Sequence, residues 1–228
     1  MKKNAARLRQ ALSDSHALAA RLDEPGFPLV ELELIQSWQR GRLAKTYEDL
    51  TSQDRYSAAG DFFLDELYGG LHFRQRDQEM ERVLPVMVRM LRDDMLLALA
   101  EAFELQALSL DFDIQMTTQF RNKGWDELSL PRYAEIYRAC GQAHEREQQI
   151  VLIHSLGIVL NKLVHHRLVM MLIRMLRGPA IAAGFGLLQS FLENGLNAFR
   201  IMGDGTEFIE AIWQRENEFM RTLLAGKE

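Results

Sequence analysis

Residues 150–176, with the sequence IVLIHSLGIVLNKLVHHRLVMMLIRML, decide the fold class of this chain. Apolar side chains recur there at every third or fourth position, whereas the strict alternation of a strand is scarce. They also lie on more than one side of the helix that this spacing predicts. Because a helix that is apolar nearly all round must be covered by other elements, we expect residues 150–176 to form a central helix surrounded by others.

The same period runs through almost all of the 228 residues, of which 47% are hydrophobic and only five are proline. Outside the central region, helices are expected over residues 4–22, 29–43, 54–68, 75–91, 94–120, 179–202 and from about 204 onward. The central helix itself could begin near residue 130 and continue to about 175, with Gly141 and Gly157 as weak points. We therefore predict an all-α, single-domain bundle of about seven to nine helices. Residues 1–228 form one unit, and residues 1–28 could lie at its periphery.

Composition and charge exclude several classes of protein. A single cysteine is too few for a disulfide framework or a cysteine-based zinc site. The net charge of -5 argues against a nucleic-acid-binding domain that relies on its overall charge. Charged residues interrupt every apolar run that could serve as a signal peptide or cross a bilayer. We expect a cytoplasmic protein with no membrane span.

One long stretch of the chain, residues 148–192, contains no Asp or Glu. It carries Lys162, Arg167, Arg174 and Arg177, whose directions on a helix are spread all around the axis. A helix lying on a membrane surface needs its charges on one side, so that interpretation is disfavoured. We expect these cations to pair with carboxylates in residues 61–113; a basic surface for an acidic ligand or partner is the alternative.

Residues 62–68 read FFLDELY and lie on the helix expected over residues 54–68. Most apolar residues of this helix form one stripe that faces a core, but Phe62 points away from that stripe. Another helix or the loop around Phe27 could cover Phe62. Alternatively, Phe62 is an exposed anchor for a basic partner, ringed by Asp61, Asp65 and Glu66.

The FFLDELY segment matches six of the seven positions of a Phe-Phe-Leu-Glu-Glu-Leu-Tyr motif, with Asp65 in place of the first Glu. On this basis the chain resembles an uncharacterised bacterial family known by that motif. Residues 74–85, 177–180 and 191–193 are also similar to the family's pattern, so the resemblance covers most of the chain after the first expected helix. It implies membership of the family and no particular activity, cofactor or catalytic residue.

One polar and aromatic face on the helix expected after residue 130 has the composition of a ligand site. Steps of three, four and seven residues would place Tyr137, Cys140, His144, Glu147 and His154 on one face of that helix. Among these, His144 and Glu147 are candidate metal ligands, and Tyr137, Cys140, His144 and His154 are candidate contacts to a cofactor such as haem. A seam between two helices would give the same pattern.

No complete catalytic signature accompanies these residues. The HExxH and Gly-x-Ser-x-Gly motifs and the glycine patterns of nucleotide-binding loops are absent. We therefore expect a non-enzymatic module, without catalytic residues or a cofactor, that acts by binding a protein partner or itself. Its first candidate surface is Phe62 with Asp61, Asp65 and Glu66. The alternative is a helical bundle that binds a small molecule, a metal or haem through the Tyr137–His154 face.

Overall fold

A computed structural model describes residues 2–64, 79, 82–85, 88–89 and 91–226 of the chain. Every regular element in these ranges is a helix, and nine of them have nine or more residues. The helices are α1 (Asn4–Arg21), α2 (Leu29–Thr46), α3 (Glu48–Thr51), α4 (Asp54–Phe62), α6 (Asp93–Lys123), α7 (Leu130–Ala139), α8 (Ala143–Leu163), α9 (Arg167–Ala182), α10 (Gly186–Met202) and α11 (Thr206–Ala225). The prediction of an all-α bundle of seven to nine helices is confirmed. No helix in the described ranges has the length and apolar character needed to cross a membrane.

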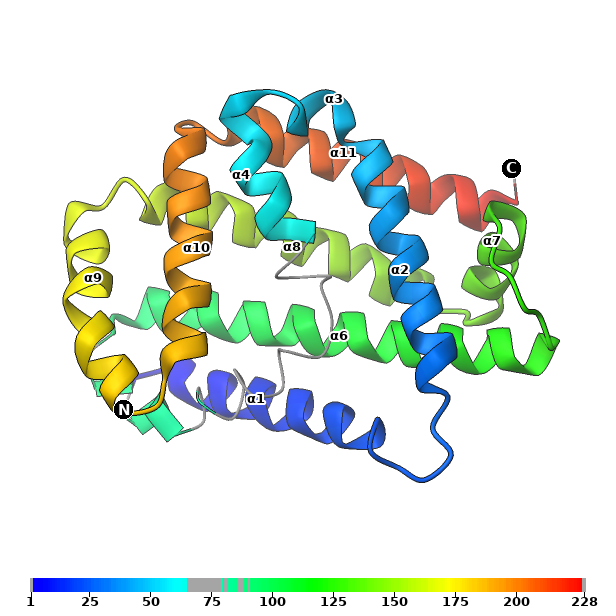
Figure 1. Ribbon diagram of the computed structural model, residues 1–228, viewed down its shortest axis with the longest axis horizontal. Helices are drawn as coiled ribbons and strands as arrows, with labels where there is room; N and C mark the ends of the chain where they lie inside the picture. The colour runs from blue at the N-terminus through cyan, green and yellow to red at the C-terminus, as the bar shows by residue number, and fades with distance from the viewer. Residues whose placement is uncertain (1, 65–78, 80–81, 86–87, 90, 227–228) are drawn as a thin grey trace.

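The helices lie in two layers (Figure 1). In one layer α1, α6, α8 and α11 run side by side, with α6 and α8 in the middle. In the other layer α2, α4 and α10 cross over these helices at a steep angle. Helices α7 and α9 lie at opposite ends of the molecule. The site described below lies between the two layers.

The N-terminal helix packs closely along α6. Its apolar positions Ala5, Leu8 and Leu12 are almost fully buried, in a cluster that includes Leu96 and Phe103 of α6. Their spacing of three and four residues places them on one side of α1, which is why the helix can lie flat on its neighbour. Although α1 occupies the edge of its layer, it contributes a fully buried face to the core.

The single central helix predicted from residue 130 onward is wrong in its extent, because the chain breaks there twice. Gly141 adopts φ +66°, a conformation that L side chains rarely tolerate, and it separates α7 from α8. Gly157 does not interrupt α8 but gives Ile209 of α11 room to approach. The second break falls between Leu163 and Arg167, where neither glycine nor proline marks it. Of the segment expected to form the central helix, α8 lies in the middle of its layer, and α9 lies at one end of the molecule.

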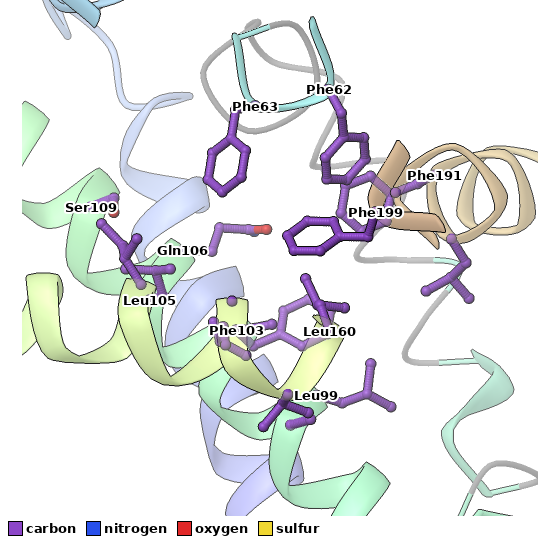
Figure 2. Close-up of a pocket in the computed structure, with 18 of the residues that line it drawn as sticks. Phe62, Phe63, Leu99, Phe103, Leu105, Gln106, Ser109, Leu160, Phe191 and Phe199 are labelled. Carbon is purple, nitrogen blue, oxygen red and sulfur yellow. The ribbon is translucent and has the colours of Figure 1, made fainter. Parts of the chain in front are cut away.

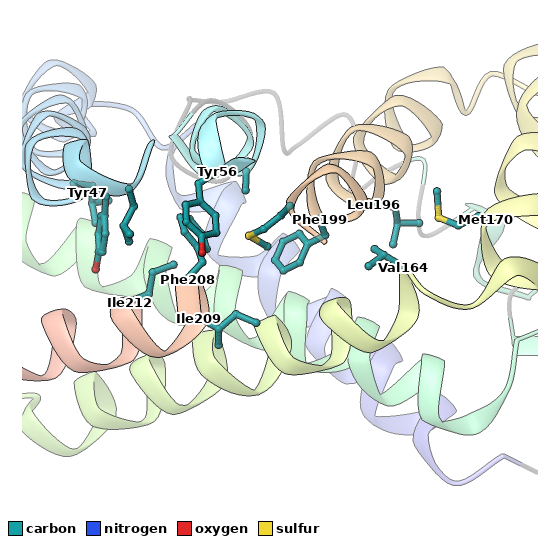
Figure 3. Packing of buried hydrophobic residues seen from close by; sticks show 13 residues of the cluster. Tyr47, Tyr56, Val164, Met170, Leu196, Phe199, Phe208, Ile209 and Ile212 are labelled. Carbon is teal, nitrogen blue, oxygen red and sulfur yellow. The ribbon is translucent and has the colours of Figure 1, made fainter. Parts of the chain in front are cut away.

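Aromatic side chains join the two layers (Figure 3). Tyr56 of α4 stacks on Phe208 of α11 with ring centroids 5.4 Å apart, and Phe199 of α10 is fully buried beside them. Helices α4 and α10 approach closely at Gly195, where the ring of Phe62 occupies the space that a larger side chain would take. These contacts hold the crossing helices in place above α8.

Candidate functional site

A cavity of about 630 Å³ lies between the two layers of helices. The walls come from both layers: α6 and α8 on one side, and α2, α4 and α10 on the other. In the close-up of Figure 2, Phe62 and Phe63 lie opposite Phe103 and Leu105. The volume of the cavity falls within the range of about 300–1,000 Å³ that is typical of small-molecule sites.

The helical period of α6 explains the apolar wall. Met95, Leu99, Ala102, Gln106 and Ser109 recur at steps of three and four residues and therefore face the cavity together. The amide of Gln106 donates a hydrogen bond to Ser15 of α1 at 3.0 Å. Because the first three of these side chains are apolar and the Gln106 amide is engaged with α1, this stretch of α6 gives a largely apolar wall.

Aromatic rings form the opposite wall. Phe62 and Phe191 lie with centroids 5.4 Å apart, and the buried Phe199 is next to them in Figure 2. Phe62 is only 8% exposed, so the interpretation of this residue as an exposed partner anchor is wrong. The expected alternative, cover by another helix, is what α10 provides. Asp61 is exposed on α4.

The other two residues of that candidate surface, Asp65 and Glu66, lie outside the described residues. An acidic partner-binding cluster around Asp61 therefore stays a prediction, and Phe62 cannot be its exposed apolar centre.

Polar side chains gather where α2, α6, α7 and α8 meet, and we call this group the polar end of the cavity. Its members are Gln36, Gln39, Asp113, Tyr133, Tyr137 and Arg146, all of which line the cavity. Asp113 accepts hydrogen bonds from the amide of Gln36 at 3.0 Å and from that of Gln39 at 3.2 Å. Burial raises the pKa of the Asp113 carboxyl group, although these two hydrogen bonds and the charge of Arg146 oppose the rise.

Arg146, in the first turns of α8, is the buried cation of this polar end. Its side chain is 6% exposed, and its guanidinium carbon lies 3.8 Å from the ring centroid of Phe112 and 4.5 Å from that of Tyr137. One terminal nitrogen, Nη2, lies 3.1 Å from the sulfur of Met116. The Nε atom has no hydrogen-bond partner among the described residues. The guanidinium thus packs against aromatic rings and forms no ion pair with a described carboxylate, although its charge acts on the nearby Asp113.

A second arginine in the cavity wall is paired with a carboxylate. Arg42 of α2 donates two hydrogen bonds to the carboxylate of Glu216 on α11, at 2.6 and 2.9 Å. The hydroxyl of Tyr47 donates a third to the same carboxylate at 2.7 Å. This fork-to-carboxylate geometry is the strong form of an ion pair. The pair joins α2 to α11, so the guanidinium of Arg42 already has a carboxylate, whereas that of Arg146 forms no ion pair with a described residue.

A family model described as Domain of unknown function (DUF8198) matches residues 17–228. The chain belongs to this family. No curated protein and no solved structure matches it.

In this DUF8198 chain the candidate face from Tyr137 to His154 is divided by the turn at Gly141. Tyr137 lines the cavity, whereas Cys140 caps the C-terminus of α7 and is half-buried. Burial raises the pKa of the Cys140 thiol, which favours the protonated form over a thiolate. No hydrogen bond joins Cys140 to His144, whose ring nitrogen contacts Gln148.

The remaining residues of that face point elsewhere. His144 and Glu147 are exposed at the start of α8, and His144 contacts Gln148 at 2.9 Å. His154 lies 2.8 Å from the carboxylate of Glu210 and packs beside Trp213. Within the described ranges, no three His, Cys, Asp or Glu side chains are grouped in a way that could hold a metal ion. Of the five predicted residues, the fold brings only Tyr137 to the cavity.

Sequence reasoning missed Arg146 and Asp113, since charged residues on helices are usually exposed. A signal was nevertheless present. Arg146 precedes Ile150, Ile153 and Gly157 at steps of four, three and four residues, so it continues the buried stripe of α8. In the same way Asp113 lies three residues after Leu110 on the buried stripe of α6. A charge on an apolar stripe is the pattern that would have identified both in this DUF8198 chain.

Proposed function

We propose that this protein binds a small apolar molecule in the cavity between its two helical layers. The observation that carries the proposal is the cavity of about 630 Å³ with walls of leucine and phenylalanine. At about 24 cal/mol per Å³, filling such a volume with apolar atoms is worth up to about 15 kcal/mol before the entropic cost of binding. Even a fraction of this free energy is enough for micromolar affinity, which requires about 8 kcal/mol.

The test uses Nile red, an uncharged apolar dye, as the probe. Leu160→Trp enlarges a side chain that lines the cavity, whereas Val151→Trp places the same ring on the exposed side of the same helix. We expect saturable binding by the unmodified protein, at least about tenfold weaker binding by Leu160→Trp, and no change for Val151→Trp. Equal affinities for all three proteins would place the dye outside the cavity and refute the proposal.

A second candidate function is the binding of an acidic protein surface at α9. Met171 and Met175 are 57% and 63% exposed on this helix, and Arg167 and Arg174 join them around a shallow hollow. Arg177 lies 3.7 Å from Glu193 of α10, and it forms no ion pair with a described carboxylate of residues 61–113, where its partner was expected. Exposed methionines flanked by arginines favour a partner surface with an apolar centre and an acidic rim.

A photo-crosslinking residue at position 175, compared with one at the exposed Val30, tests this second candidate. We expect a crosslink to one protein from position 175 only. With that protein purified, binding should weaken as salt rises and in Met171→Ser/Met175→Ser. Equal crosslinking from both positions would refute the candidate. Adsorption to vesicles of anionic lipid without a protein crosslink would show that α9 binds a membrane surface and not a protein.

A further inference from the structure

We propose that Arg146 binds the carboxylate of the molecule held in the cavity, so that the ligand class is a long-chain monocarboxylate. This inference rests on the proposed function and adds the chemistry of the ligand's head group. It follows from the position of one almost fully buried cation at the polar end of a cavity whose remaining walls are largely apolar.

Arg146 lacks acceptors for part of its guanidinium group. A guanidinium group carries five N–H donors, and a cation removed from water is stabilised when an anion or several acceptors take those donors up. Arg146 is almost fully buried, its Nε atom has no partner among the described residues, and the one polar contact of Nη2 is the sulfur of Met116. Thioether sulfur is a weak acceptor, so donor capacity remains at the cavity wall.

The carboxyl groups that line the polar end already have hydrogen-bond donors. Glu216 is paired with Arg42, and its two carboxylate oxygens accept three hydrogen bonds from Arg42 and Tyr47. Asp113 accepts from Gln36 and Gln39. Because burial raises the pKa of Asp113, this carboxyl group takes up a proton more readily when a second anion arrives. The polar end can therefore accept one further negative charge beside Arg146.

The polar end has the shape and the donors that a carboxylate requires. The planar guanidinium offers its Nε and Nη donors as a fork that matches the two oxygens of a carboxylate. The hydroxyls of Tyr133 and Tyr137 line the same end, and burial raises the pKa of both, so both remain protonated and can donate. The apolar walls around Phe103 and Leu160 then receive the hydrocarbon chain. A carboxylate at the polar end and a chain along the apolar walls describe a fatty-acid-like molecule.

The experiment compares four competitors with the same chain, dodecanoate, dodecan-1-ol, dodecylamine and dodecyl phosphate, for displacement of Nile red at about pH 7.5, where the acid is ionised. We expect dodecanoate to bind roughly tenfold to a hundredfold more tightly than dodecan-1-ol, as a charged hydrogen-bonded head group does. Arg146→Met should abolish this preference while dodecan-1-ol still binds. The matched control Arg9→Met changes an exposed arginine on α1 and should leave the preference intact.

The outcomes separate this inference from the proposed function. If none of the four molecules displaces the dye, both are overturned. If acid and alcohol bind equally and Arg146→Met changes neither, the cavity binds apolar molecules and the assignment of the head group is wrong. Preference for the amine would show that Asp113, and not Arg146, contacts the head group. Preference for the phosphate would show that the ligand class is a phosphate ester and not a carboxylate. The comparison of the four molecules on the unmodified protein decides these cases even if Arg146→Met does not fold.

Discussion

Replacing Gly195 by alanine tests how tightly α10 crosses α4. A methyl group at this position would lie 2.7 Å from Cζ of Phe62 and 3.1 and 3.2 Å from two further ring atoms, whereas ordinary contacts begin at 3.4 Å. The ring must therefore retreat by about 0.7 Å to restore contact distance. Phe191 packs against the same ring and restricts that movement.

The magnitude follows from two opposing effects. Overpacking a core costs about 1–3 kcal/mol, whereas exchanging glycine for alanine inside a helix gains about 1 kcal/mol. Gly41 of α2 is the matched control, because a methyl group there would meet nothing within 4 Å. Gly41→Ala should raise the free energy of unfolding by up to about 1 kcal/mol, and Gly195→Ala should fall below it by about 1–3 kcal/mol.

The assay is urea-induced unfolding followed by circular dichroism, together with the thermal midpoint, which moves by about 2–4 °C per kcal/mol in a domain of this size. In a Phe62→Leu background the ring is gone, so Gly195→Ala should then behave like Gly41→Ala. Equal free energies for Gly195→Ala and Gly41→Ala in the unmodified background would show that Phe62 moves freely into the cavity. That result would refute the tight crossing.

Three further predictions concern single residues, and urea-induced unfolding measures each of them. Gly141→Ala should lower the free energy of unfolding by about 1–2 kcal/mol, because alanine is strained at φ +66° although no neighbouring atom would clash with its methyl group. An unchanged free energy of unfolding would mean that the turn relaxes to another conformation. Glu216→Gln weakens the partly buried pair with Arg42 and should lower the free energy of unfolding by about 1.5–3 kcal/mol, whereas Asp49→Asn at an exposed ion pair should change it little. Because the pKa of Asp113 is raised in the folded state, stability should fall as the pH rises from about 4 through that pKa, and Asp113→Asn should flatten this decline. An unchanged slope in Asp113→Asn would contradict the assignment.

The helical period of the apolar residues determined the fold class without help from the structure. It placed α1, α2 and α6 within a few residues of their observed bounds, because each buries a continuous stripe that is visible in the sequence. The same reasoning predicted Gly141 as a weak point, since only glycine accepts a left-handed turn without strain. It also offered cover by another helix as one interpretation of Phe62.

Only the tertiary structure decided where the candidate site lies. The expected face from Tyr137 to His154 required one unbroken helix, and the turn at Gly141 rotates its two halves apart. The cavity depends on how α2, α4 and α10 cross α6 and α8, and packing angles between helices distant in the chain are not encoded in a local period. For the same reason the burial of Arg146 and Asp113, which makes the polar end of the cavity, emerged only when those helices came together.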